Sequence, residues 1–362
     1  MQPSAIRLFL PGNVRHNSGG NAYNAALVRA LDALGVPATT RTADGDWPVG
    51  GPADRAALGN LFAEPAGHGT VTLMDGLVAY GAPEQLEAAA RAGTPVWILL
   101  HMPLDGYADL EGRALAAAAG VICSSSAAAA DLRARHGLDG ADTTVAVALP
   151  GTDRAETAAG STPPHLAMVA ALLPNKSQLL FLQALTALTD LDWTAALVGA
   201  DTADPEYAAL LRAETERLGL GARVRIPGEL RGDALDAEWA RTDLTLLISR
   251  AETFGMAVTE SLARGIPAII RRGTGALEAL TAGTPQAGPG AARGEEAEGD
   301  DAGLPGAAVA LAEDPAPLAE LLRRWLTEPE LRARWRSTAL DARQHLPGWD
   351  ATARTVLEIL GR

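Results

Sequence analysis

Short apolar runs alternate with amphipathic segments along most of the chain. Runs rich in Val, Ile and Leu predict buried strands at 6–10, 70–74, 96–100, 121–124 and 145–149, and again at 165–171, 194–198, 223–226, 244–248 and 267–271. Segments with helical periodicity predict helices at 22–34, 83–92, 127–135, 176–188, 205–218, 233–240, 317–325, 329–341 and 349–360. Strands that alternate with helices over short connections are typical of parallel sheets with helices on both faces. The pattern therefore predicts an α/β protein.

Two segments interrupt this alternation. Residues 156–164 are rich in Ala, Gly, Ser, Thr and Pro and predict an interdomain linker, and residues 283–306 lack periodicity and predict a mobile loop. A chain of 362 residues is long for one core and suits two domains of roughly 150 to 180 residues each. Because open parallel sheets bind ligands at the carboxyl ends of their strands, we expect the ligand site in the cleft between two such sheets.

Charge and cysteine content narrow the class of partner. The formal net charge of -14 disfavours nucleic acid and anionic membranes, which are bound by clustered Lys and Arg. Segment 52–62 carries only one Arg and no basic stripe, so we expect no stable membrane association. Cys123 is the single cysteine, and the first residues have too short an apolar run for a signal peptide. These features predict a cytoplasmic protein.

The segment 249–267 has the pattern of an anion site. It follows a predicted strand and opens a helix whose first turn carries Gly255. A helix N-terminus presents free N–H groups and the positive end of the dipole, and Gly255 allows an anion to approach the backbone. Glu252 precedes this helix and Glu260 lies about two turns along it. Because carboxylates accept hydrogen bonds from hydroxyls, the segment predicts a ligand with sugar rings on both sides of a phosphate.

This segment resembles the Glu-x7-Glu motif of retaining, nucleotide-sugar-dependent glycosyltransferases of family 4. Phe254-Gly255 and Gly265-Ile266-Pro267 match as well; the alternative is an ordinary strand-loop-helix with solvated carboxylates. The resemblance implies the GT-B fold, in which two Rossmann-like domains face each other across a cleft and a C-terminal helix crosses back to the first domain. It implies an acceptor-binding domain at 1–153, a nucleotide-sugar-binding domain at 154–340 and the returning helix at 341–362.

The resemblance also implies a donor site. Lys176, in VAALLPNKSQ, matches the lysine that pairs with the donor diphosphate, and an ammonium at a predicted helix start favours a negative group nearby. Glu252 would hold hydroxyls of the donor sugar, and Glu260 would hold those of the ribose. The other donor-binding residues that the resemblance implies are Gly19, Gly20, Gly199, Glu229, Leu230, Thr253, Phe254, Gly255 and Met256.

One departure from the family concerns the diphosphate. Ala170-Ala171 stands where the family usually has Gly-Arg, so the arginine that accompanies Lys176 is missing. The positions that could supply a second cation are Arg15, Arg250, Arg271 and Arg272. Without one, we expect weaker donor binding or slower turnover, and a degenerate, non-catalytic protein is the alternative.

Candidate residues in the first domain also follow predicted strands. His101, in LLHMPL, is similar in place to a family histidine that hydrogen-bonds the transferred sugar; with Glu252 and Lys176 it makes up the predicted catalytic set, and a structural role is the alternative. The loop 12–21 resembles the family's Gly-Gly loop near the donor diphosphate and the acceptor. The predicted acceptor contacts are Arg15, His16, Asn17 and Asp75, of which Asp75 has the alternative of capping the turn at Gly76.

The activity that the resemblance implies is transfer of a glycosyl unit from a nucleoside diphosphate sugar to a small-molecule acceptor, with retention of configuration. Members of the family that modify lipids often carry a basic amphipathic helix near the N-terminal domain surface, and segment 52–62 has no basic stripe, so we expect a soluble acceptor. The sequence contains no Asp-x-Asp signature in a suitable place and no Cys/His cluster, so we expect no metal and no cofactor beyond the sugar nucleotide as co-substrate. Two alternatives remain: a non-catalytic sugar-nucleotide-binding protein, and another enzyme on the same fold, such as a nucleotide-sugar epimerase or a phosphorylase.

Overall fold

The computed structural model describes residues 3–14, 18–64, 67–104, 106–138, 143–284 and 303–361. The chain divides into two compact units. Unit 1 comprises Met1–Gly151 and Gly348–Arg362, and unit 2 comprises Thr152–Pro347. Each unit has its own sheet and its own apolar core.

Unit 1 is built on a parallel sheet of six strands in the order β2-β1-β3-β4-β5-β6. Its strands are β1 (Ala5–Pro11), β2 (Ala38–Ala43), β3 (Thr70–Asp75), β4 (Val96–Leu100), β5 (Gly120–Cys123) and β6 (Thr144–Val147). The central strands are apolar and buried on both faces, which is what a parallel sheet covered by helices requires. Because the strands are parallel, their carboxyl ends lie on one side of the unit. Asp75 ends β3 there, and His101 directly follows β4.

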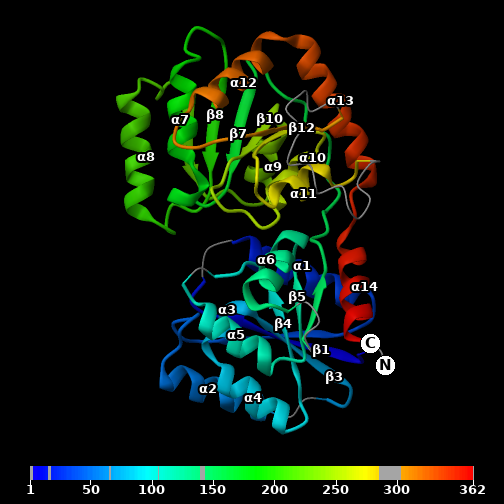
Figure 1. Ribbon diagram of the computed structural model, residues 1–362. Helices are drawn as coiled ribbons and strands as arrows, with labels where there is room; N and C mark the ends of the chain where they lie inside the picture. The colour runs from blue at the N-terminus through cyan, green and yellow to red at the C-terminus, as the bar shows by residue number, and fades with distance from the viewer. Residues whose placement is uncertain are drawn as a thin grey trace. The chain divides into compact units, whose positions relative to one another are not determined.

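The helices of unit 1 are α1 (Gly19–Ala33), α2 (Pro52–Ala63), α3 (Gly76–Gly81), α4 (Pro83–Arg91), α5 (Ala108–Ala117), α6 (Ser126–His136) and α14 (Trp349–Leu360). The last helix, α14, packs beside α1, as Figure 1 shows. The Tyr23 ring meets Trp349 edge to face with centroids 5.4 Å apart, and Thr352 donates to the carbonyl of Leu149. Gly151 has no room for a side chain, because a Cβ there would lie 2.3 Å from the backbone nitrogen of Trp349.

Unit 2 has a second parallel sheet, in the order β12-β11-β10-β7-β8-β9. Its strands are β7 (His165–Val169), β8 (Thr194–Val198), β9 (Val224–Gly228), β10 (Leu244–Leu247), β11 (Ala268–Arg271) and β12 (Gly306–Val309). Its helices are η1 (Pro174–Lys176, a 3₁₀ turn), α7 (Gln178–Thr186), α8 (Pro205–Arg217), α9 (Asp233–Ala240), α10 (Met256–Leu262), α11 (Ala276–Thr281), α12 (Ala316–Thr327) and α13 (Pro329–His345). The core between sheet and helices contains Phe181 and three tryptophans, Trp193, Trp325 and Trp335.

The segment before β7 is bound to unit 2 by hydrogen bonds. The amides of Ala159 and Gly160 donate to the carbonyl of Ala240, and the Asp243 carboxylate accepts from the amides of Ser161 and His165. The prediction that residues 156–164 form a linker between domains is therefore wrong: their composition is that of irregular structure, but their backbone is anchored to one unit. The loop predicted at 283–306 lies largely outside the described residues.

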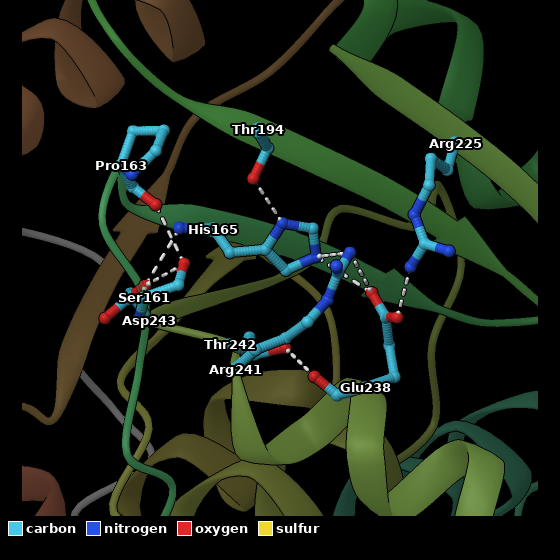
Figure 2. A network of polar contacts seen from close by, with 9 residues as sticks. All are labelled: Ser161, Pro163, His165, Thr194, Arg225, Glu238, Arg241, Thr242 and Asp243. Carbon is cyan, nitrogen blue, oxygen red and sulfur yellow. Dashed lines mark hydrogen bonds and ion pairs between the residues drawn. The ribbon is translucent and has the colours of Figure 1, made fainter.

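A cluster of polar and charged side chains surrounds His165, the first residue of β7, as Figure 2 shows. It therefore lies at the amino end of this strand. His165 bridges Thr194, 2.7 Å from its Nδ1, and Glu238, 2.8 Å from its Nε2. The Glu238 carboxylate also pairs with Arg225 and Arg241, at 2.6 and 3.2 Å. Burial would raise the pKa of Glu238, but its contacts with His165, Arg241 and Arg225 outweigh burial and lower that pKa. The cluster joins α9 to the strands β7, β8 and β9.

Candidate functional site

The candidate site in unit 2 lies where β7, β10 and β11 end. These strands are parallel neighbours in the sheet, so the segments that follow their carboxyl ends come together. Nζ of Lys176 lies 2.9 Å from Oε2 of Glu252, and the hydroxyl of Ser249 donates to the same oxygen at 3.3 Å. Glu252 is thus the partner of Lys176 within the protein. The side chains of Lys176 and Glu252 are 21% and 15% exposed, so the pair remains open to solvent.

Two glycines fix the backbone that follows Glu252. Gly275 donates its amide to the Glu252 carbonyl at 2.7 Å, and a Cβ at Gly275 would lie 1.8 Å from the carbonyl oxygen of Thr253. Gly255 has φ +96°, in the left-handed region, and a Cβ there would meet the Leu247 side chain at 2.6 Å. At both positions a side chain would clash with the neighbouring chain, so the loop packs this closely only with glycine.

This loop leaves backbone donors unused. In the described part of the chain, no group accepts a hydrogen bond from the amides of Phe254, Gly255 or Met256. They lie at the start of α10, where helix geometry leaves the first N–H groups without intrahelical partners. Close to Lys176 and Glu252, they form a group of donors suited to an anion.

Glu260 is half-buried on α10, one residue before the buried Ser261. No described residue forms a hydrogen bond or ion pair with its carboxyl group. Burial raises the pKa of Glu260 to about 7; Arg264 opposes this shift, and Asp153 adds to it. The guanidinium of Arg264 is directed to Asp236 and to the Glu260 carbonyl instead of the carboxylate. The carboxyl oxygens of Glu260 are thus available to a ligand.

The structure places three of the four cations considered as partners of Lys176. Arg250 is exposed and pairs with Glu313 at 2.9 Å, and Arg272 donates to the carbonyl of Ala308. Arg271 is only 8% exposed. Arg15 lies outside the described residues.

Arg271 is a buried cation that is bound by neutral groups. Its guanidinium donates to the carbonyls of Ile248 and Leu311 and, at 3.2 Å, to the hydroxyl of Ser177. No described carboxylate forms an ion pair with it, and burial, followed by the nearby charge of Arg250, lowers its pKa. Ser177 directly follows Lys176 and has φ +61°, which is uncommon for a residue other than glycine. The charge of Arg271 therefore lies beneath the turn that presents Lys176.

The predicted base-binding residues follow β8 and β9. A Cβ at Gly199 would lie 1.8 Å from the carbonyl oxygen of Ala170, so glycine is required there by close packing of two backbone segments. Glu229 forms an ion pair with Arg231 at 2.9 Å, and Leu230 is half-buried. Because β8 and β9 run parallel to β7, these positions follow the carboxyl ends of the strands, as Lys176 does.

In unit 1, two of the candidate residues, Gly20 and Asp75, lie next to His101. Gly20, in the first turn of α1, packs against its ring: a Cβ at Gly20 would lie 2.9 Å from Cδ2 of His101. Nε2 of His101 lies 3.0 Å from Oδ1 of Asn24 and 3.5 Å from Oδ2 of Asp75. Sequence reasoning missed Asn24; the available signal was an amide on the inward face of a helix whose neighbouring positions are apolar. Gly19 begins the helix with open space around it.

Three of the predicted acceptor contacts, Arg15, His16 and Asn17, lie outside the described residues. The fourth, Asp75, is buried and caps α3 by accepting a hydrogen bond from the Leu77 amide at 3.0 Å. Within the described residues, no group of three or more His, Cys, Asp or Glu side chains is arranged to hold a metal ion. Among the helices of the described part, none is both long and apolar enough to cross a membrane.

Solved structures with the same fold are glycosyltransferases of the GT-B class. HepE from Anabaena, in complex with UDP and glucose, superposes with a TM-score of 0.71 and 16% identity over 99% of each chain. Sucrose-phosphate synthase from Thermosynechococcus elongatus gives 0.75 and 17%, covering 100% of this chain and 98% of that one. The catalytic domain of starch synthase IV from Arabidopsis thaliana, bound to ADP and acarbose, gives 0.72 and 12%, over 100% and 99%. At these identities the likeness defines the fold.

The sequence defines the family. The model of the family "Glycosyl transferases group 1" matches residues 151–341, which is more than half of the chain. The protein therefore belongs to the group 1 glycosyltransferase family, and the matched residues include Lys176, Glu252 and Glu260. A search of curated proteins by sequence found no match.

Proposed function

We propose that the protein is a retaining glycosyltransferase of family 4 that transfers a sugar from a nucleoside diphosphate sugar to a soluble small-molecule acceptor. The observation that carries this proposal is the grouping of the Lys176–Glu252 pair with the unpaired amides of residues 254–256 and the unpartnered carboxyl of Glu260. One ammonium, several N–H donors and two carboxyl groups suit a diphosphate between two hydroxyl-bearing rings. Unit 2 would bind the donor, and unit 1 would bind the acceptor.

The diphosphate is the centre of the proposed mechanism. As the bond to the sugar breaks, negative charge develops on the departing phosphate, and donors held in place before the reaction stabilise that charge most effectively. Lys176 and the amides of Phe254, Gly255 and Met256 would supply these donors. The Gly275 amide, which donates to the Glu252 carbonyl, and the close packing at glycines 255 and 275 would hold these amides in place before the donor binds.

Arg271 is the proposed second cation. Its charge is buried among carbonyls and a hydroxyl, and no described carboxylate forms an ion pair with it, although the charge of Glu313 acts on it from farther away. A buried charge in a low-dielectric environment acts over a longer range than an exposed one. It would favour an anion at Lys176 without touching it and would take over part of the role of the arginine that Ala171 replaces.

The carboxyl groups and the histidine would recognise hydroxyls. Glu252, already ion-paired with Lys176, would accept hydrogen bonds from the donor sugar, and Glu260 would accept them from the ribose. His101 would hydrogen-bond the transferred sugar. For retention we propose front-face attack, in which a phosphate oxygen of the donor takes the acceptor proton. The reaction would need no metal and no further cofactor. It would take place in the cytoplasm.

The test begins with a thermal-shift screen of UDP-, GDP-, ADP- and dTDP-sugars. The best ligand is then incubated with the protein and with Glu252→Ala, and released nucleoside diphosphate is measured, followed by the anomeric configuration of any transfer product. We expect slow donor hydrolysis that Glu252→Ala abolishes, and products that keep the donor's configuration. Inverted products would overturn the retaining mechanism.

Ala171 supports a second candidate, a protein that binds sugar nucleotides without turnover. Tight binding with no hydrolysis or transfer under any acceptor would favour it over the enzyme. Recovery of an altered sugar nucleotide in place of released diphosphate would favour an epimerase on the same fold.

A further inference from the structure

His101 is held in unit 1 by a short chain of hydrogen bonds. It directly follows β4, Asp75 ends the neighbouring strand β3, and Asn24 lies on α1. Nδ2 of Asn24 is 3.0 Å from Oδ2 of Asp75, and Oδ1 of Asn24 is 3.0 Å from Nε2 of His101. Asn24 and Asp75 are 1% and 4% exposed, so water does not compete for these bonds.

The donors and acceptors in this chain of bonds have only one consistent direction. A carboxylate accepts hydrogen bonds, so the amide nitrogen of Asn24 faces Asp75 and donates to it. The amide oxygen then faces His101 and can only accept. The second neighbour of Nε2, at 3.5 Å, is the Asp75 carboxylate, which is again an acceptor. Both groups next to Nε2 thus require a proton on that nitrogen.

The ring is packed on two sides, and its hydrogen bond to Asn24 distinguishes its two orientations. Gly20 lies against the Cδ2 side of the imidazole, where even a Cβ would approach to 2.9 Å. The Tyr23 ring packs against it edge to face, with centroids 5.1 Å apart. A ring turned over by 180° would exchange carbon and nitrogen positions and lose the bond to Asn24. The side chain of His101 is 18% exposed, and no described residue forms a hydrogen bond with Nδ1.

Burial lowers the pKa of His101, and the Asp75 charge opposes this shift without reversing it. The ring is therefore neutral at neutral pH, and one nitrogen carries the single proton. A proton on Nε2 leaves a lone pair on Nδ1. Such a nitrogen accepts a hydrogen bond from a hydroxyl, whereas a carboxylate or phosphoryl oxygen has no proton to donate to it.

We propose that Asn24 and Asp75 are positioning residues that hold His101 as the Nε2-protonated tautomer, so that Nδ1 accepts a hydrogen bond from a sugar hydroxyl. The second half rests on the proposed function: it assigns the bound sugar a hydroxyl at this point and disfavours a carboxylate, as in a uronic acid. The first half concerns unit 1 alone. In this proposal Asp75 orients Asn24 and His101, whereas the sequence predicted that it contacts the acceptor.

Nuclear magnetic resonance of the full chain labelled with 15N-histidine tests the tautomer directly. His101 is assigned by the signal that His101→Gln removes, and two-bond correlations report which ring nitrogen carries the proton. We expect a proton on Nε2 and none on Nδ1 in the wild type, and a mixture of tautomers in Asn24→Leu. Should Asn24→Leu fail to fold, Asp75→Asn serves instead, because an amide at 75 no longer fixes the direction of Asn24.

A proton on Nδ1 in the wild type, or an unchanged tautomer in the folded variant, would overturn the inference. Kinetics with the donor found in the screen test the second half. Asn24→Leu should lose about tenfold in kcat/KM, the equivalent of one hydrogen bond. Equal rates with a sugar donor and its uronate would contradict the assigned hydroxyl. A wild type with the expected tautomer but no turnover would sink the proposed function and leave the tautomer assignment standing.

Discussion

Glu260 is a half-buried carboxyl group with no hydrogen-bond partner among the described residues. A side chain in this state is costly to ionise, which is why its pKa is raised to about 7. Its ordinary value is near 4.5. At pH values between 4.5 and about 7, the carboxyl group of Glu260 is largely protonated in the folded, ligand-free protein and largely ionised in the unfolded chain. Glu260 therefore makes folding less favourable as the pH rises through that interval.

We expect donor binding to tighten as the pH rises from 6 to 8. A ligand hydroxyl donates to the ionised carboxylate, so binding favours the ionised form and releases a proton below pH 7. Calorimetric titration at pH 6, 7 and 8 with a sugar nucleotide checks this, because the diphosphate of such a ligand does not titrate in that range. Glu260→Gln should bind with the same affinity at all three values. A pH slope that persists in Glu260→Gln would assign the effect to another group.

Some residues of the site were readable from the sequence and others were not. Glu252 and Lys176 come together as an ion pair because each follows a strand of one parallel sheet, which alternation of apolar runs predicts. The sequence alone did not indicate the structural roles of Arg271 and Asn24. Their significance lies in partners distant in sequence, such as Ser177 for Arg271 and Asp75 for Asn24, and no local pattern encodes those contacts.

At the scale of elements, the candidate donor site is a set of strand ends with short loops. Its rigidity comes from contacts between the loops. Gly275, at the start of α11, supports the backbone of residues 252 and 253 on the neighbouring loop. A side chain at 275 would have to displace backbone, which yields less readily than the end of a flexible side chain.

We expect Gly275→Ala to destabilise the protein by about 1–3 kcal/mol, the usual cost of overpacking, and to weaken donor binding. The displaced loop carries the amides of residues 254–256, so both effects share one cause. Gly59→Ala is the matched control: a Cβ there meets nothing within 4 Å, and alanine in a helix favours stability by about 1 kcal/mol. Chemical denaturation and donor titration give the two readouts. Unchanged donor affinity in a destabilised Gly275→Ala would separate this loop from the binding site.

The cluster around Glu238 (Figure 2) lies at the amino ends of the strands in the sheet of unit 2, whereas the candidate donor site follows their carboxyl ends. We expect Glu238→Gln to lower the free energy of unfolding by about 1–3 kcal/mol while donor affinity stays unchanged. The pKa of Glu238 is lowered in the folded state, so its contribution is complete above the carboxyl's ordinary value and is lost as the pH falls through the lowered one. The difference between wild type and Glu238→Gln, measured by denaturation, should therefore shrink in acid. A difference that grows in acid would contradict this account.

Sequence reasoning missed the helices α2 and α5, of 12 and 10 residues, and several elements that are short or polar. Strand β2 has four exposed positions among six residues and lies at the edge of the sheet, so it lacks an apolar run. Strand β12 has four residues, and α3 and α11 have six each, which is too short for periodicity to be counted. The helix predicted to begin at Lys176 begins at Gln178, because a 3₁₀ turn and the left-handed Ser177 precede it.

For the whole molecule, the proposal assigns donor binding to unit 2. Hydrogen exchange measured with and without a sugar nucleotide shows the ligand's footprint on the full chain. We expect slower exchange at residues 254–256 and around Lys176, where free amides gain partners, and no change in α2 and α4 of unit 1. Protection confined to unit 1 would place the nucleotide in the other unit and refute the assignment.

The central claim is that Lys176 holds the diphosphate of a sugar nucleotide, and calorimetric titration with the best ligand of the screen tests it most directly. Lys176→Met keeps the length of the side chain and removes its charge. Because a hydrogen bond to a charged group contributes about 1.5–3 kcal/mol, this variant should bind roughly 10- to 100-fold more weakly. Arg250→Gln, which removes an exposed charge paired with Glu313, should bind like the wild type. Equal affinity of Lys176→Met and the wild type would contradict the account.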